Sequence, residues 1–336
     1  MKSHNIGIVG ATGAVGLKIL QVLDERVKNP ASIRLFASER SAGQQIEFRG
    51  SMLTVENLAT ANFSGLDVVF FSAGTEVSLK YCPAAVEAGA LVIDNTNAHR
   101  MRPDVPLIVP EANLHAVKGH HGLIANPNCS TIQMIVALAP IHKVNPIRRI
   151  VVSTYQSVSG TGLEAIDILK KQSEAMLTGK NPPEGVYPHP IGFNLIPQID
   201  VPVDGGLYRE EEKMVKETCK ILEADIKVCP TTIRVPVMYC HSEVVNIELT
   251  DQMQLAALRN ILANAEDVVL VDDPGNSVYP TPLSCQDKDE VFVGRLRQDP
   301  TIANGFNMWI VADNLRRGAA TNAVKIYTEM VRHDLF

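Results

Sequence analysis

Short apolar runs alternate with amphipathic segments along the first part of the chain. The apolar runs cover residues 6–9, 33–37, 67–72, 91–94 and 123–125, and helical spacing marks residues 15–24, 78–87 and 130–142. Strand-like runs that alternate with helices are typical of parallel strands joined by crossovers. This part therefore predicts an α/β fold with a doubly wound parallel sheet. Residues 46–58 break the alternation and predict an inserted hairpin.

The pattern changes after residue 147. We expect strands at 150–156, 231–238, 244–249, 291–296 and 306–312, helices at 163–177 and 209–222, and a long proline-rich loop over 181–202. This mixture predicts a second domain of the α+β class. Apolar positions at helical spacing over 319–331 predict a last helix that packs back on the first domain. We therefore place the first domain at residues 1–131 with 314–336, and the second at 132–313.

Composition and charge narrow the classes of protein. The chain has 336 residues, of which 46% are hydrophobic and 20% charged, enough for one large or two medium domains. Its net charge of −6, without a long basic run, argues against a surface that binds nucleic acid. The N-terminus shows no signal-peptide pattern, and no apolar stretch reaches the ~18 residues of a membrane span. We expect a cytoplasmic protein.

The segment 126–132, with the sequence NPNCSTI, contains a cysteine in an unusual position. The chain has six cysteines and no CxxC pair, and most such cysteines are small buried hydrophobic residues. Cys129 differs because it follows an expected strand and opens an apolar helix. Unpaired N–H groups and the positive end of the helix dipole favour thiolate there. We therefore predict that Cys129 is a nucleophile that attacks an electrophilic carbon.

Three glycines follow the first expected strand in the segment 10–16, GATGAVG. Glycine permits a tight turn at 10, close approach of a pyrophosphate at 13, and close packing of helix against strand at 16. The start of the helix then receives the anion. Strand, glycines and helix in this order predict a Rossmann-like dinucleotide site made by Gly10, Ala11, Thr12, Gly13, Ala14 and Val15.

The loop after the second expected strand bears on which dinucleotide binds. Glu39 could hold the ribose 2′-hydroxyl, as carboxylates do in NAD sites. Ser38, Arg40 and Ser41 instead offer hydroxyls and a guanidinium that suit a 2′-phosphate, so we favour NADP. Gly74 follows a later strand, where a small residue would let the cofactor lie across the carboxyl edge of the sheet.

Two polar residues could act with Cys129, and their sequence context leaves the roles open. His241 ends an apolar run and could exchange protons near neutrality, although a lone histidine after a strand is more often structural. Gln156 ends an expected strand, where its amide could orient a substrate carbonyl or face solvent.

The sequence also leaves the roles of four charged residues undecided. Arg100 and Arg234 lie in apolar, proline-flanked segments, and buried arginines usually contact a carboxylate or phosphate of protein or ligand. Glu210 and Lys213 share a helix face, which is most simply a surface ion pair. Arg234 and His241 are seven residues apart, so on one continuous strand they would face opposite sides. We expect the strand to bend or end between them, at Pro236 or at the Cys240–His241 junction.

Together these motifs resemble the aspartate-β-semialdehyde dehydrogenase family. The matching segments occur in family order over nearly the whole chain: 10–16, 94–96, Arg100, 126–131, 153–160, 188–191, Glu210 with Lys213, 234–237, 241–243 and 312–316. The cysteine segment and the tyrosine-glutamine pair at 155–156 are highly specific. The resemblance implies a dinucleotide-binding domain followed by a catalytic and dimerisation domain, and an assembly that is commonly a homodimer.

The resemblance also implies a role for each matching residue. Cys129 resembles the nucleophile, His241 its acid/base partner, and Gln156 the residue that orients the thioacyl intermediate. The implied substrate contacts are Asn128, Arg234 on the α-carboxylate, Glu210 near the amine, and Arg100 and Lys213 at the phosphate. Gly74, Gly160 and Asn314 would add contacts to NADP, and no metal is implied.

The implied reaction is the reversible, NADPH-dependent reduction of L-aspartyl-4-phosphate to L-aspartate 4-semialdehyde through a Cys129 thioester. It leads toward lysine, threonine, methionine and diaminopimelate. Two departures from the family pattern occur: Thr75-Glu76 stands where glycine and serine are frequent, which puts a cofactor contact in doubt, and Thr161 replaces a common alanine.

Three other interpretations compete with this one. N-acetyl-γ-glutamyl-phosphate reductases share the reaction class but usually have glycine and tyrosine beside the cysteine, where this chain has Asn128 and Ser130. Glyceraldehyde-3-phosphate dehydrogenases share the chemistry with a different cysteine environment. A non-catalytic paralogue would keep the fold alone, and the presence of Cys129, Gln156, Arg234 and His241 argues against it.

Overall fold

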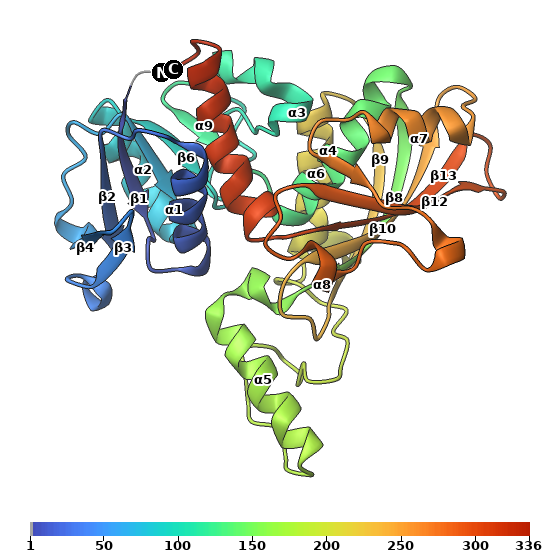
Figure 1. Ribbon diagram of the computed structural model, residues 1–336, viewed down its shortest axis with the longest axis horizontal. Coiled ribbons are helices and arrows are strands. Elements are labelled where there is room, and N and C mark those ends of the chain that lie inside the picture. Colours follow the sequence, from blue (N-terminus) through green and yellow to red (C-terminus); the bar gives the residue numbers. More distant parts are fainter. Residues whose placement is uncertain (1–2) are drawn as a thin grey trace. The chain divides into compact units, whose positions relative to one another are not determined.

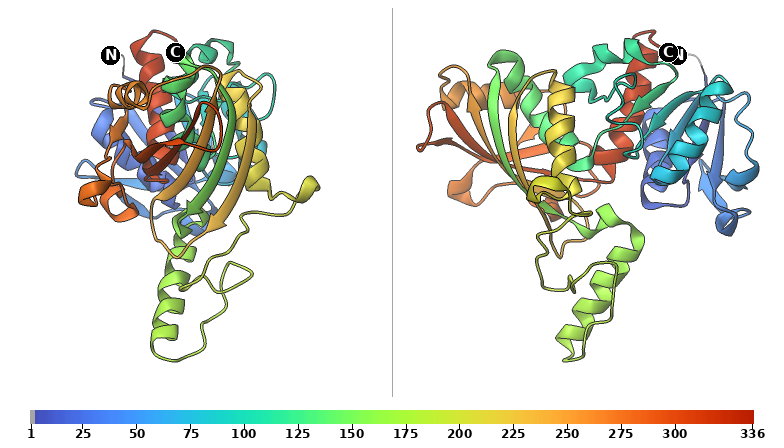
Figure 2. Two further views of the ribbon diagram at one scale, coloured as in Figure 1. Left: turned by 90° about the vertical axis from the view of Figure 1, so that its right-hand side faces the viewer. Right: turned by 180° about the vertical axis from the view of Figure 1, so that it is seen from behind.

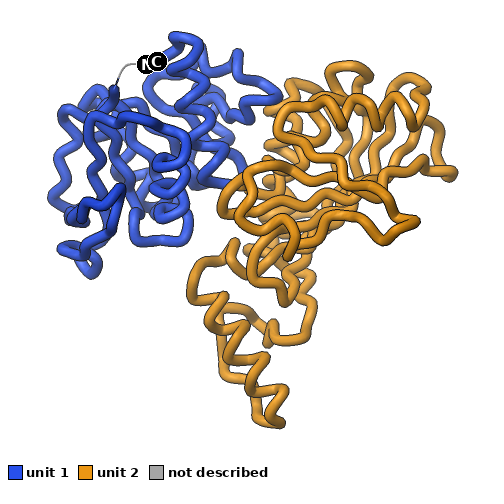
Figure 3. The backbone as a smooth tube through the Cα atoms, viewed as in Figure 1, with its two compact units in different colours: residues 1–128, 319–336 blue, residues 129–318 orange. Residues whose placement is uncertain are grey.

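The computed structural model of the chain describes residues 3–336. The chain divides into two compact units, which Figure 3 distinguishes by colour. Unit 1 comprises Met1–Asn128 and Ala319–Phe336, and unit 2 comprises Cys129–Gly318. Within the described residues, no helix is long and apolar enough to cross a membrane.

Unit 1 is built on a seven-stranded sheet in the order β3-β4-β2-β1-β5-β6-β7. The parallel strands are β1 (Asn5–Val9), β2 (Ser32–Ala37), β5 (Val68–Phe71), β6 (Leu91–Asp94) and β7 (Leu123–Ala125). This confirms the predicted doubly wound parallel sheet. The expected hairpin is β3 (Gln45–Phe48) with β4 (Ser51–Asn57), and β4 also pairs in parallel with β2, so the hairpin extends the sheet.

Helices cover both faces of this sheet (Figures 1 and 2). Helices α1 (Ala14–Arg26) and α9 (Asn322–Arg332) cover one face, and α2 (Thr75–Glu87) covers the other. The core beneath α1 and α9 includes Ile8, Phe70, Ile93 and Tyr327. The last helix therefore packs on the first sheet, as its apolar spacing predicts. The short helix α3 (Pro110–Asn113), four residues long, was not predicted.

Unit 2 contains a six-stranded mixed sheet in the order β11-β12-β13-β10-β8-β9. The strands are β8 (Ile147–Gln156), β9 (Lys227–Arg234), β10 (His241–Leu249), β11 (Val268–Leu270), β12 (Val291–Asp299) and β13 (Gly305–Ala312). Helices α4 (Cys129–Val144), α6 (Arg209–Leu222) and α7 (Leu255–Ala263) pack against the sheet and against one another. Even-numbered residues of β8 from 150 to 156 are buried and their odd-numbered neighbours half-buried, so one face is covered and the other more open.

Helix α5 (Leu163–Leu177) lies apart from the sheet of unit 2 (Figure 2). Its apolar side packs with Val158, Ile191 and Ile196, so the proline-rich segment 181–202 is held against the helix. That segment contains no helix and only isolated bridges, as predicted. Helix α8 (Pro282–Cys285), like α7 and β11, was not predicted from the sequence.

Four strand predictions in unit 2 were wrong at one or both ends. The strands expected at 150–156 and 291–296 are longer, at Ile147–Gln156 and Val291–Asp299. The strand expected at 231–238 is Lys227–Arg234, and the one expected at 244–249 begins at His241. Polar residues at 241–243 resemble a loop in the sequence, yet they pair with both neighbouring strands. Residues 235–240 instead form the connection, and Cys240 has φ +70°, in the left-handed region.

Candidate functional site

Three neighbouring strands of unit 2 place polar side chains at one corner of the sheet. In the parallel pair of β8 and β9, Gln156 is opposite Arg234. In the antiparallel pair of β8 and β10, Tyr155 is opposite Ser242, which brings His241 beside Gln156. All three side chains are buried on the helix-covered face. The turn at 235–240 removes the parity conflict between Arg234 and His241, because they lie on separate strands.

Arg234 is a buried cation without a carboxylate partner among residues 3–336. Arg234 is 5% exposed, and its Nη1 donates a hydrogen bond to the backbone oxygen of Ser157 at 2.7 Å. The ring of Tyr187 lies 5.8 Å from the guanidinium carbon. Its Nε is buried and has no hydrogen-bond partner within the described chain. A buried guanidinium in this state can receive an anion.

His241 is held in one tautomer by its neighbour. Its Nδ1 accepts a hydrogen bond from the backbone N–H of Ser157 at 3.0 Å, so the neutral ring carries its proton on Nε2. Burial, reinforced by the positive charge of Arg234, holds the pKa of His241 well below 6.5. The ring is therefore neutral near pH 7. Its Nε2 is buried and meets no partner in the described part of the protein, so it can donate to a ligand.

Gly160 keeps the space between these two groups open. A β-carbon on Gly160 would lie 3.2 Å from both Arg234 Nη1 and His241 Nε2. The guanidinium and the imidazole therefore face the same small volume. Any side chain at position 160 would fill it.

A second set of polar groups continues from Gln156. Its Nε2 donates to Glu210 Oε1 at 3.2 Å, and Lys213 Nζ donates to Glu210 Oε2 at 3.2 Å and to Asp200 Oδ2 at 2.9 Å. Glu210 is only 4% exposed, whereas its spacing from Lys213 in the sequence predicted an ion pair on the surface. The structure thus brings Gln156, Glu210 and Lys213 together. Asp200 was missed because it lies in the irregular segment before α6.

Cys129 is the first residue of α4 and is half-buried. The helix begins one residue before its predicted start, so the thiol lies at the end where backbone N–H groups lack intrahelical acceptors. One turn further along, Gln133 Nε2 lies 3.4 Å from the backbone oxygen of His241 and donates to it. The helix that carries the thiol is therefore linked to the strand that carries the imidazole.

Glu243 lies beneath this corner and was not singled out from the sequence. It is fully buried, two residues after His241, and neither carboxylate oxygen has a hydrogen-bond partner in the described chain. Burial raises the pKa of Glu243 well above its usual value and thereby favours the neutral acid. Its alternation with Val245 and Ile247, which share its buried face, is the sequence signal that could have placed it inside.

The loop that follows β8 is braced by one asparagine. Asn314 Oδ1 accepts from the hydroxyls of Ser157 and Ser159, each at 3.1 Å, and from the backbone N–H of Cys240 at 3.0 Å. Sequence reasoning assigned Asn314 to the cofactor, and these bonds give it a place in unit 2 beside His241. Ser157 and Ser159 were missed because serines in a loop carry no distinct signal.

The glycine segment of unit 1 has the geometry of a phosphate cradle. Gly10 has φ +86°, and a β-carbon on Gly16 would lie 2.1 Å from the backbone oxygen of Gly10. Both positions therefore require glycine. Helix α1 starts after Gly13, and no side chain caps it. Its first N–H groups are thus directed at whatever anion occupies the turn.

The loop proposed to select the cofactor lies next to this cradle. Thr12 Oγ1 donates to Ser41 Oγ at 3.4 Å, which joins the two segments. Ser38 and Arg40 are exposed. Gly74 has φ +95° and precedes α2, whose first residue Thr75 bonds to Asn97.

Arg100 and Asn128 also belong to unit 1 and are buried. Arg100 donates from Nε to the backbone oxygen of Asn126 at 2.9 Å and from Nη2 to that of Asn95 at 2.8 Å. Asn126 in turn accepts from Asn322 of α9 at 2.7 Å. These bonds fix the backbone that leads to Asn128, and Asn322 was not expected to take part.

Known proteins are similar to this chain over nearly its full length. The family model "Semialdehyde dehydrogenase, NAD binding domain" matches residues 5–120, and "Semialdehyde dehydrogenase, dimerisation domain" matches residues 138–317. Aspartate-semialdehyde dehydrogenase of Aquifex aeolicus (strain VF5) is 48% identical over 99% of each chain. That of Legionella pneumophila is 50% identical over 97% of this chain and 95% of its own. The crystal structure of aspartate semialdehyde dehydrogenase II from Vibrio cholerae, complexed with ASA, matches with a TM-score of 0.96 at 44% identity over 99% of both chains.

Proposed function

The chain belongs to the aspartate-semialdehyde dehydrogenase family, and from that premise we propose that it interconverts L-aspartyl-4-phosphate and L-aspartate 4-semialdehyde with NADPH and NADP. The proposal includes a thioester on Cys129. In the biosynthetic direction the product would feed lysine, threonine, methionine and diaminopimelate synthesis.

The observation that carries the proposal is the unpaired, buried guanidinium of Arg234. Its Nε lacks a partner among the described residues, and its Nη1 already bonds to a backbone oxygen. The free edge suits the two oxygens of an α-carboxylate. Glu210, joined to Gln156 by a hydrogen bond, would accept from the α-ammonium group of the same substrate. A site for an amino acid must contact both a carboxylate and an ammonium group, and Arg234 and Glu210 carry the two opposite charges that this requires.

Cys129 supplies the nucleophile. The α4 start favours the thiolate, which attacks the acyl-phosphate carbon; the C–O bond to phosphate breaks, and phosphate leaves with its electron pair. A thioester then joins the substrate to Sγ. The sulfur is half-buried, so a substrate reaches it while Gly318 and α4 hold it in place.

His241 acts on the substrate oxygen. With Nδ1 occupied by the Ser157 N–H, its Nε2–H can donate to the carbonyl oxygen as negative charge gathers there. A neutral imidazole can fill this role because its Nε2 carries the hydrogen that the substrate oxygen accepts. In the opposite direction, the same nitrogen would stabilise the oxygen formed when the thiolate adds to the aldehyde.

The glycine cradle of unit 1 fits a dinucleotide, because Gly10 and Gly16 leave no room for side chains where a pyrophosphate must approach. When bound, the nicotinamide supplies the hydride that reduces the thioester carbon. We propose NADP rather than NAD because Ser38, Arg40 and Ser41 lie next to the cradle. Arg40 would contact the 2′-phosphate.

We also propose that the protein forms a homodimer through the open face of the unit 2 sheet. Tyr155 and Trp309 stand together on that face, with ring centroids 5.8 Å apart. Val244 and Trp309 line a hollow there with Tyr279 and Pro280. Half-buried aromatic side chains on a sheet face are typical of interface cores. The second family model, described as a dimerisation domain, covers this sheet.

Parallel assays test the proposed activity. Phosphate-dependent reduction of NADP and of NAD is measured with aspartate semialdehyde, N-acetylglutamate semialdehyde and glyceraldehyde 3-phosphate. We expect that aspartate semialdehyde is the only one of the three aldehydes that supports reduction, and that NADP is the cofactor reduced. Faster turnover of N-acetylglutamate semialdehyde would favour the closest rival family, and no turnover of any of the three would favour a non-catalytic role.

A further inference from the structure

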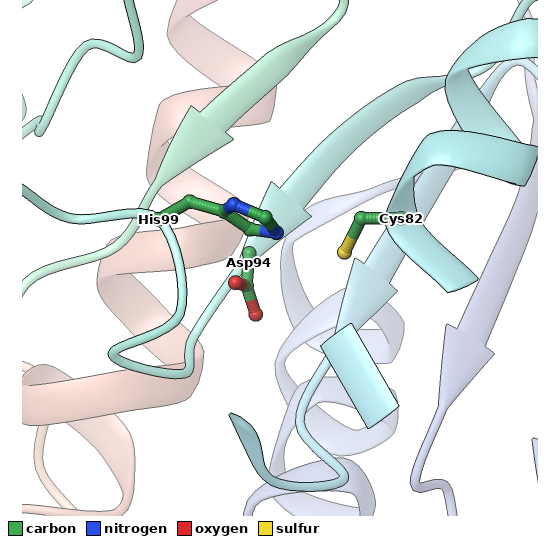
Figure 4. A group of neighbouring side chains, drawn as sticks. All are labelled: Cys82, Asp94 and His99. Atoms are coloured by element: carbon green, nitrogen blue, oxygen red, sulfur yellow. The ribbon is translucent and has the colours of Figure 1, made fainter. Parts of the chain in front are cut away.

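Three potential metal ligands, none of which was given a role above, converge in the core of unit 1. Cys82 lies on α2, Asp94 ends β6, and His99 follows in the next loop. Their ligand atoms all lie within 4.8 Å of one another, and none of the three residues is more than 3% exposed. Figure 4 shows the thiol and the imidazole directed toward each other, with the carboxylate beside the ring.

The imidazole of His99 carries the independent sign that something binds here. Both ring nitrogens are buried, and neither has a hydrogen-bond partner in the described part of the chain. Buried polar groups are almost always satisfied, because leaving one unpaired costs about 1–3 kcal/mol. A ring with two unsatisfied nitrogens, one of them near a thiol and a carboxylate, is chemically suited to bind a cation.

The charges at this cluster also lack balance. Asp94 accepts hydrogen bonds from Ser78 Oγ at 2.9 Å, Thr96 N at 2.9 Å and Thr96 Oγ1 at 3.0 Å. Within residues 3–336 it forms no ion pair with a lysine or arginine. The cluster thus places a carboxylate without a cationic partner beside a thiol and an imidazole, and all three side chains are buried.

We propose that Cys82, Asp94 and His99 form a binding site for one zinc-like divalent cation. On binding, the Cys82 S–H bond breaks, its proton leaves to solvent, and the thiolate bonds to the metal. Two positive charges then meet one thiolate and one carboxylate, so the core becomes neutral. One thiolate, one imidazole and one carboxylate are a ligand set that Zn²⁺ and Co²⁺ accept, with a water in the fourth position.

The site's place in the fold gives the ion a structural effect. It would join helix α2, strand β6 and the loop that contains His99. The next residue, Arg100, holds the backbone of Asn95 and Asn126 by hydrogen bonds. Metal binding at His99 should therefore stiffen the segment 94–100 and stabilise unit 1.

Cobalt titration tests the proposal on the full chain. Co²⁺ bound by a thiolate in tetrahedral geometry has characteristic charge-transfer and visible absorption bands. The titration uses the Cys129→Ser variant as its background, so that the half-buried thiol of Cys129 cannot bind the metal. We expect one Co²⁺ per chain, release of about one proton per metal from the thiol, and a raised thermal midpoint.

Three further substitutions in that background decide the assignment. Cys82→Ser should remove the thiolate band and the proton release. His99→Gln should weaken metal binding at least tenfold, and it keeps the proposal falsifiable if the serine variant does not fold. Cys229→Ser is the matched control, because Cys229 is exposed and remote from the cluster in sequence, and it should change nothing. An unchanged band in Cys82→Ser, unchanged affinity in His99→Gln, or no Co²⁺ binding to the parent would overturn the proposal.

Discussion

Gly318 packs directly against Cys129: a β-carbon on Gly318 would lie 2.7 Å from the Cys129 Cβ and 3.1 Å from its Cα. Gly318 lies in the π-helical turn Arg316–Thr321, where Arg317 and Arg316 bond to Asp267 and Asp289. These two ion pairs therefore hold the turn in place. The absence of a side chain at 318 lets it approach the nucleophile.

Gly318→Ala should displace Cys129 and reduce kcat by about a hundredfold, since misplacing a reacting atom by about 1 Å has an effect of that size. Overpacking should also lower the free energy of unfolding by about 1–3 kcal/mol. Steady-state kinetics and urea unfolding measure the two effects. Gly275→Ala is the control, because its β-carbon would be 3.7 Å from its nearest neighbour; an equal loss in both variants would contradict a specific contact.

Arg234→Lys should reduce kcat/KM by roughly 10²–10³, equivalent to about 3–4 kcal/mol, because one ammonium group cannot reproduce a two-point contact with a carboxylate. NADP affinity should not change. Initial-rate kinetics and a cofactor titration measure both. Arg148→Lys, at an exposed position on β8, serves as the matched control. An unchanged kcat/KM in Arg234→Lys would remove this residue from the site.

His241 should make stability fall in acid. Its pKa in the folded state is well below 6.5, the value it regains on unfolding. Below pH 6.5 the unfolded chain therefore binds more protons than the folded chain, and stability decreases by up to about 1.4 kcal/mol per pH unit. His241→Asn should lack this contribution. Urea midpoints between pH 5 and 8 measure the difference, which His115→Asn, at an exposed position, should not reproduce. Parallel curves for wild type and His241→Asn would contradict a neutral ring.

Glu243 should have the opposite effect as pH rises above about 4.5. Its folded pKa is raised well above 4.5, so the unfolded chain loses its proton first as pH rises. The contribution of Glu243 to the free energy of unfolding is therefore fully present below about pH 4.5, and it is lost as pH rises toward the folded pKa. Glu243→Gln keeps the shape and the neutral state, so it should become more stable than wild type as pH increases, with kcat little changed. A stability difference that does not vary with pH would show that Glu243 is ionised in the folded protein.

The sequence predicts the elements of both units well wherever local pattern decides them. Helices 163–177 and 209–222 have the predicted ends, because apolar spacing and flanking breakers agree there. The strand ends at Arg234 and His241 could not be placed. Val235 and Val237 favour a strand, and only pairing with β8 and β13 determines where each strand stops.

In the candidate site, too, the residues marked by a local pattern could be predicted and those placed by long-range pairing could not. A cysteine at a helix start and three glycines after a strand are local signals, and they identify Cys129 and the cradle. The link from Gln156 to Glu210 spans 54 residues, and Ser157 contacts His241 across 84. Such contacts depend on strand order, which no local pattern contains. Gly318 would be read as an ordinary turn residue, because its importance lies in the atom it approaches.

The central claim is a covalent bond between the substrate and Cys129, and one experiment tests it most directly. The enzyme is mixed rapidly with aspartate semialdehyde and NADP in the absence of phosphate, and both NADPH and the mass of the Cys129 peptide are measured. The account predicts a burst of about one NADPH per chain together with an aspartyl adduct on that peptide, because no acceptor releases the thioester. Turnover by Cys129→Ser, or a burst without any adduct on this peptide, would contradict it.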